Sequence, residues 1–175
     1  MPYRHLFAAL LIACAAARAD GVADKFRECR TGDSDRAVAA CTWYLNAGYN
    51  LSPANKAFAL MLRAQAHIAL KQLPEALADY AAAAQAEPRN AEAWYNHAVV
   101  ASGLDRIDVA IADLDHAIAL RPDWAQAYVS RAAMHLANGE PQKALEDDTR
   151  ALQLDPNNAL AIADKASAEQ RLGHQ

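Results

Sequence analysis

Residues 91–124 read AEAWYNHAVVASGLDRIDVAIADLDHAIALRPDW, and this stretch is one period of a pattern that recurs along most of the chain. Four kinds of position share a step of 34 residues: Pro88, Pro122 and Pro156; Ala64, Ala98, Ala132 and Ala166; Ala76, Ala110 and Ala144; Ala83, Ala117 and Ala151. Because four registers agree on one period, the chain is predicted to be an array of repeats that stack on their neighbours.

Each period is predicted to fold as two helices. An amphipathic run is followed by a short break near Lys71, Asp105 or Gly139, and a second run ends before the proline, which cannot continue a helix. Ser52 and Pro53 are predicted to cap and start one of the first helices. Hydrophobic residues make up 54% of the sequence but aromatic ones only 7%, so small alanines are expected where facing helices approach closely.

The period, the paired helices and the closing proline resemble the tetratricopeptide repeat. The early aromatic place of that repeat holds Leu60, Trp94 and Tyr128, and its eighth place holds alanine each time. The resemblance implies an all-α, right-handed superhelical solenoid of about nine helices, and it points to an exported bacterial protein of this family.

Boundaries follow from the repeat register. We predict a signal peptide at 1–19, an atypical first repeat at 20–56, full repeats at 57–90, 91–124 and 125–158, and a polar capping helix at 159–175. Helix hairpins are expected at about 22–46, 53–87, 91–121 and 125–155, followed by a last helix from about 159.

The first nineteen residues have the pattern of a secretory signal. Arg4 precedes an apolar run from Leu6 to Ala16, and small residues precede the expected cut between Ala19 and Asp20. The run is too short to span a bilayer, which needs about 20 apolar residues. We therefore expect a periplasmic or secreted protein.

Leu11-Ile12-Ala13-Cys14 resembles the lipobox of bacterial lipoproteins, so a lipid anchor on Cys14 remains the alternative to cleavage after Ala19. Cleavage removes two arginines and no acid, which leaves 15 basic against 21 acidic side chains and a net charge of −6. Such a surface repels phosphate backbones, so nucleic acid is not an expected partner, and a membrane is one only if Cys14 is lipidated.

Two cysteines, Cys29 and Cys41, remain after cleavage. An even count in an exported chain predicts a disulfide, which would join the two helices of the first repeat. The alternative is a pair of small buried thiols. No metal site is expected, because no histidine or further cysteine completes a tetrahedral set.

Polar residues of the repeats favour packing over chemistry. His67 and His135 lie two periods apart and cannot share one ion. Asp148 stands where other repeats have Tyr80 and Leu114, so we expect it to bond His135 of the facing helix. A catalytic dyad is the alternative, but no nucleophile accompanies it. We therefore predict no catalytic residue, metal or cofactor.

The resemblance implies a concave face lined by the first helix of each repeat. The residues carried over to this face are Phe58, Met61 and Gln65; Tyr95, Asn96 and Val99; and Val129, Ala133 and Leu136. Met61, Tyr95 and Val129 share one place and are expected to form a continuous exposed stripe with Tyr95 as its anchor. Packing of these apolar side chains in the core is the alternative.

The predicted function is a non-catalytic scaffold that binds a protein or peptide segment in this groove. Binding of a chaperone tail is disfavoured, because Asn96 matches one asparagine of that family's carboxylate clamp but the basic residues are missing. The second hypothesis is a component of a cell-envelope assembly anchored through Cys14. The third is an enzyme of the envelope.

Overall fold

The computed structural model describes residues 21–48 and 50–173, which form nine helical segments and no strand. After a helical segment at 21–31 come α2 (Ser34–Asn46), α3 (Pro53–Ala69), α4 (Leu73–Ala86), α5 (Ala91–Gly103), α6 (Ile107–Leu120), α7 (Ala125–Ala137), α8 (Pro141–Leu154) and α9 (Ala159–Gly173). The expected fold class is confirmed, and each expected hairpin begins and ends within one residue of its place in the structure. The predicted signal, its cut after Ala19 and the lipobox cysteine Cys14 lie outside the described residues.

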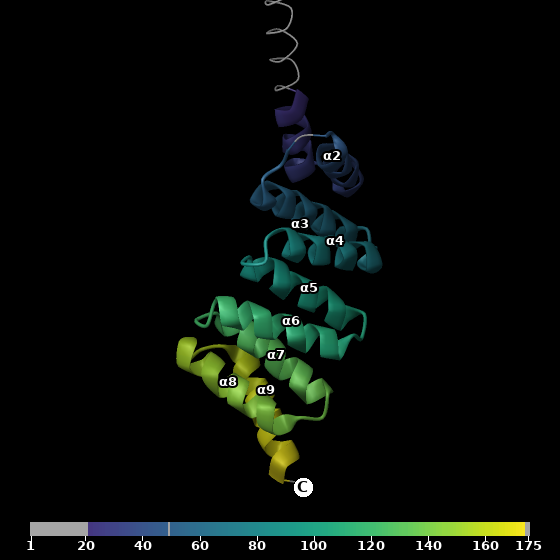
Figure 1. Cartoon of the computed structure of the whole chain (residues 1–175). Coiled ribbons are helices and arrows are strands. Elements are labelled where there is room, and N and C mark those ends of the chain that lie inside the picture. The colour runs from purple at the N-terminus through teal and green to yellow at the C-terminus, as the bar shows by residue number, and fades with distance from the viewer. Residues whose placement is uncertain (1–20, 49, 174–175) are drawn as a thin grey trace, which may run out of the picture.

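The helices follow one another as hairpins stacked along one axis (Figure 1). α3 packs on α4, α5 on α6 and α7 on α8, while α4 also contacts α5 and α6 contacts α7. First helices touch first helices, since α5 contacts α7 and α7 contacts α9. One face of the stack is therefore built from α3, α5 and α7.

Local sequence explains where the helices start. The hydroxyl of Ser52 accepts a hydrogen bond from the backbone N–H of Asn55 at 3.2 Å, and Pro53 occupies the first turn, as predicted. Asn90 caps α5 through the N–H groups of Glu92 and Ala93, each at 3.1 Å. Each cap satisfies N–H groups that have no partner within the helix.

Periodic alanines fill the contacts between helices. Ala64, Ala98 and Ala132 are at most 1% exposed, and the alanines of the second helices, Ala76, Ala110 and Ala144, are fully buried. Larger side chains such as Leu60, Tyr80 and Leu114 fill the space between them. Small residues at the crossings let the helix axes approach, while the large ones supply most of the buried apolar area.

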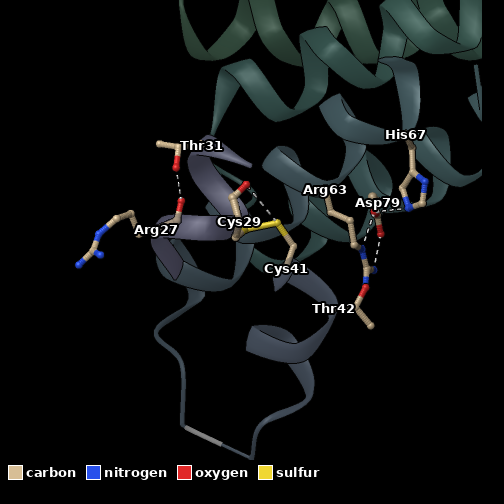
Figure 2. Close-up of a disulfide and its surroundings, with 8 residues drawn as sticks. All are labelled: Arg27, Cys29, Thr31, Cys41, Thr42, Arg63, His67 and Asp79. Atoms are coloured by element: carbon tan, nitrogen blue, oxygen red, sulfur yellow. Dashed lines mark hydrogen bonds and ion pairs between the residues drawn. A yellow bond between two sulfur atoms is a disulfide. The ribbon is translucent and has the colours of Figure 1, made fainter. Parts of the chain in front are cut away.

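A disulfide holds the first hairpin together (Figure 2). Cys29 and Cys41 are bonded, with Cα atoms 4.8 Å apart, and both side chains are buried. Gly32 forms the turn between them, where a Cβ atom would lie 2.6 Å from the carbonyl oxygen of Glu28. The glycine is therefore required by the tight passage from the 21–31 segment into α2.

The turns inside the three full hairpins have one geometry. Lys71, Asp105 and Gly139 occupy equivalent places with φ of 60°, 59° and 75°. The residue that follows each of them donates a backbone hydrogen bond of 2.8–2.9 Å to a carbonyl five residues earlier, which closes the helix end. Only glycine adopts this left-handed conformation without cost, so Lys71 and Asp105 are strained.

We predict that Lys71→Gly raises the free energy of unfolding by about 1 kcal/mol, because it relieves the left-handed strain of a residue with a Cβ. Urea denaturation followed by circular dichroism measures the change. The reverse substitution, Gly139→Lys, is the matched control: no atom lies within 4 Å of an added Cβ there, so only conformational strain acts. It should cost about as much as Lys71→Gly gains. Equal stability of all three proteins would contradict the prediction.

Candidate functional site

The face built from α3, α5 and α7 does not expose every side chain expected on it. Phe58 and Val99 are 44% and 46% exposed, and Gln65 is exposed as well. Tyr95, Asn96 and Ala133 are partly buried. Met61, Val129 and Leu136, in contrast, are only 7%, 3% and 8% exposed.

The expectation of a continuous exposed stripe through Met61, Tyr95 and Val129 is therefore wrong. Met61 belongs to the main core, and its sulfur lies 3.9 Å from the side-chain nitrogen of Asn90 in the next hairpin. Val129 packs with Ala151 and Ala161, from α8 and α9. Residues of the next hairpin help to cover Met61 and Val129, so these two side chains form the floor of the face and are not exposed on it.

A hollow of about 270 Å³ opens between α5 and α7. Its lining consists of Tyr95, Ala98, Val99, Ser102, Leu114, Ser130, Ala133 and Met134. None of these eight side chains carries a charge, and three of them carry a hydroxyl group. A binding pocket for a drug-sized molecule or cofactor usually has about 300–1,000 Å³, so this hollow fits one large apolar side chain better than a whole ligand.

Tyr95 forms a fixed wall of the hollow. Its ring centroid lies 4.5 Å from that of Trp124, and its hydroxyl lies 3.2 Å from the hydroxyl of Ser130 in α7. The guanidinium of Arg121 lies over the ring of Trp124 at 3.7 Å and also pairs with Glu92. These contacts order the wall, so a bound side chain would meet a surface that is already arranged.

A periodic layer of ion pairs, which is not among the features predicted from the sequence, runs inside the stack. Arg63 Nη2 lies 2.6 Å from Asp79 Oδ1. Two repeats further along the chain, Arg131 Nη2 lies 2.6 Å from Asp147 Oδ1. The aspartates are each 6% exposed. The signal was available, because Asp79, Asp113 and Asp147 follow the 34-residue step and each stands 16 residues after a basic side chain.

Two of these cations also reach the preceding hairpin. Arg63 Nη1 donates to the hydroxyl of Thr42 in α2 at 3.0 Å (Figure 2), and Arg131 Nη1 lies 2.5 Å from Asp115 Oδ1 in α6. His97 takes the same place in α5 and pairs with Asp113 at 2.5 Å. The arginines therefore join both the two helices of one hairpin and two neighbouring hairpins.

The predicted bond between Asp148 and His135 is not formed. His135 Nδ1 lies 2.7 Å from Glu140 Oε2, and its Nε2 lies 3.9 Å from Asp147 Oδ2. Asp147, and not Asp148, stands in the register of the aspartates that face the first helices. One residue turns a helix by about 100°, which takes Asp148 away from His135.

Asp148 is fully buried, and neither of its oxygens has a hydrogen-bond partner. Burial raises the pKa of Asp148 to about 7, and the charges of Asp164 in α9 and Asp147 in α8 act in the same direction, whereas Lys165 opposes them. Burial also raises the pKa of Asp164. Two acids with raised pKa values therefore meet at the contact between α8 and α9.

The remaining histidines are distributed along the stack. His67 Nδ1 lies 2.7 Å from Gln72 Oε1, and the ring of His116 lies 4.6 Å from that of Trp94.

Within residues 21–48 and 50–173, no three histidine, cysteine or acidic side chains are placed to hold a metal ion. In the same part of the chain no helix has the length and apolar character needed to cross a membrane.

Comparison with known proteins shows what these features resemble. The model of the tetratricopeptide repeat matches residues 91–123, and the chain resembles the first such domain of RPAP3, solved bound to an HSP90 peptide, at 28% identity. That match has a TM-score of 0.67 and covers 69% of this chain and 95% of the other. One repeat of this chain therefore matches the tetratricopeptide repeat model, and its helix arrangement resembles that of domains built from this repeat.

Two further solved structures have similar helix arrangements. MamA is 25% identical with a TM-score of 0.74, and the match covers 81% of this chain and 80% of MamA. The TPR2B domain of yeast Sti1, solved in a pHsp70 complex, is 24% identical with a TM-score of 0.61, over 69% of this chain and 98% of that domain. No curated protein sequence matches the chain.

We predict that Asp148→Leu, the residue of the equivalent place in α6, raises the free energy of unfolding by roughly 2–4 kcal/mol at pH 8. Asp148 has a pKa of about 7 in the fold, against about 3.9 in the unfolded chain. Its contribution to stability is therefore fully present below pH 4 and is lost as the pH rises from 4 to 7. Asp148→Asn should remove most of this slope, and the raised pKa of Asp164 accounts for the part that remains. Denaturation curves from pH 4 to 8 measure it.

The exposed Asp123 supplies the matched control, because Asp123→Asn changes the same charge on the surface. It should leave the slope of the wild type in place. If Asp148→Asn keeps that slope too, Asp148 is not the group that titrates.

Proposed function

We propose that this chain is a tetratricopeptide repeat protein and a non-catalytic scaffold that binds a segment of another protein on the face of α3, α5 and α7. The observation that carries the proposal is the neutral hollow between α5 and α7, with the exposed Val99 on its lining and the exposed Phe58 farther along the same face. The related RPAP3 domain is solved with a peptide bound, which supports the same use of this fold.

The lining indicates what kind of segment would bind. An apolar side chain placed in the hollow loses contact with water, and the hydroxyls of Tyr95, Ser102 and Ser130 can bond the backbone of an extended chain. A charged side chain would be desolvated there without an opposite charge among the lining residues. We therefore propose a segment with hydrophobic anchors.

Absence of catalysis is part of this proposal. The buried acids Asp79, Asp113 and Asp147 are paired with basic side chains inside the stack. Asp148, whose pKa is the most perturbed towards neutral pH, lies at the contact with α9, away from the hollow. The hollow is therefore lined by the hydroxyls of Tyr95, Ser102 and Ser130 but by no histidine, carboxylate or amine that could activate them.

We further propose that the protein works in the periplasm or outside the cell. The bond between Cys29 and Cys41 supports this, because disulfides persist in oxidising compartments. The signal-like pattern of residues 1–19 supports it independently.

Val99→Asp should abolish capture of the partner, because a charge in the hollow is incompatible with an apolar anchor. Loss of one anchor typically weakens binding by about thirtyfold or more. The wild type and the variant are immobilised separately, and the amount of each protein that they capture from the same envelope extract is compared. Val109→Asp is the matched control, since Val109 is 41% exposed but lies on α6 outside the hollow. Equal capture by both variants would show that the hollow is not the binding site.

Intact-mass spectrometry of protein purified from cells tests export and distinguishes the two forms of the N-terminus. We expect a chain that begins at Asp20 and lacks two hydrogens relative to its reduced form, because Cys29 and Cys41 are bonded. A diacylated chain that begins at Cys14 would support the alternative of an anchored envelope component. An intact Met1 would contradict export.

A further inference from the structure

The last helix repeats the packing pattern of a first helix, but one of its faces is left open. Ala166 continues the register of Ala64, Ala98 and Ala132, which are at most 1% exposed, yet Ala166 itself is exposed. Ile162 continues the register of Leu60, which is 4% exposed, and is 52% exposed.

In α3, α5 and α7 this face is covered by the second helix of the same hairpin. α9 packs on α8 and α7 through its opposite side, where Ala161 and Ala168 are fully buried. The open face, which runs through Ile162, Ala166 and Glu169 with Lys165 at its edge, therefore has the residues of a helix contact. Among the described elements α9 contacts α8 and α7, and the side chains of Ile162, Ala166 and Glu169 are exposed.

The charges of this face select the kind of helix that fits. Lys165 takes the place of Arg63 and Arg131, which pair with aspartates of the covering helix. One turn further on, Glu169 takes the place of His67 and His135, whose Nε2 atoms lie 3.7 and 3.9 Å from those same aspartates. An acidic covering helix like α4 or α8 would be repelled by Glu169, so a fitting helix must present an acid and a base one turn apart.

We infer that the open face of α9 binds the same face of a second copy of this chain. When two α9 helices pack antiparallel about a two-fold axis, Lys165 of each copy lies opposite Glu169 of the other, so both charges are matched twice. Ile162 lies toward the far end of the partner helix, and the small Ala166 lets the two axes approach. The interface is independent of the proposed groove, which leaves the hollow between α5 and α7 accessible.

One helix from each copy buries less than the roughly 1,200 Å² of a standard interface, so the dimer should be weak and reversible. We expect self-association with a dissociation constant of about 10–100 µM. Sedimentation equilibrium of the full-length exported protein, from a few µM to 500 µM, measures it. A monomer throughout this range would overturn the inference.

Ile162→Asp should weaken association at least tenfold, because it places a charge in the apolar contact of both copies. Val109→Asp, a similar substitution at an exposed apolar side chain of α6, should leave association unchanged. A dimer that persists equally in both variants uses another surface, and the inference is then wrong.

The charge pair provides a test that a general loss of solubility or folding cannot imitate. Lys165→Glu and Glu169→Lys should each fail to self-associate, since each puts like charges opposite one another. Mixed together, the two variants should form a heterodimer as tight as the wild-type dimer, because one chain is then acidic and the other basic at both places. Since Lys165 also acts on the buried Asp148, Lys165→Gln is used if Lys165→Glu does not fold, and mixing it with Glu169→Lys should then restore one of the two charge pairs and part of the affinity. No recovery on mixing folded variants of opposite charge would contradict an antiparallel α9 contact.

Discussion

The close approach of helices at alanine is the constraint on which the rest of this structure depends. Wherever two helices of a hairpin cross, a fully or almost fully buried methyl group stands at the contact, and the same places recur every 34 residues. A larger residue there would push the helices apart, and the displacement would pass to every hairpin stacked beyond it. Identical spacing in each unit is what lets α3, α5 and α7 line up as one face.

Inside that apolar frame, the buried ion pairs fix the rotation of each helix about its axis. Apolar contacts between alanines and leucines tolerate small rotations, whereas the two-pronged contact of Arg63 or Arg131 with an aspartate does not. Desolvating these charges is costly, so their value lies in specifying one arrangement more than in adding stability. Here the specified arrangement is the one that opens the hollow between α5 and α7. Asp148 follows Asp147 of one such pair, and its buried carboxyl group is desolvated without a hydrogen-bond partner.

The periodic prolines and alanines were sufficient to predict the fold and its helix boundaries, because both residue types act locally and at short range. Side-chain exposure on the binding face was harder to predict. The position of Met61 or Val129 on a helix says which way the side chain points, but not how far the next hairpin extends over it. The ion pairs are hard to predict, because arginine and aspartate on a helix are usually exposed and burial depends on how the helices pair. The predicted partner of Asp148 is wrong because one residue changes the side of the helix that a side chain occupies.

The bridges between neighbouring hairpins are unevenly distributed, and this has a mechanical consequence. Thr42 and Asp115 each bind an arginine of the following hairpin, whereas the equivalent place in α4 is Ala81, whose methyl group cannot accept a hydrogen bond. The junction before α5 therefore relies mainly on apolar contact, with the long hydrogen bond from Asn90 to the sulfur of Met61, and such contact permits sliding and bending more readily than a short directional bond does. We expect this junction to bend more readily than the junction between α6 and α7, where Arg131 binds Asp115 and Tyr95 contacts Ser130.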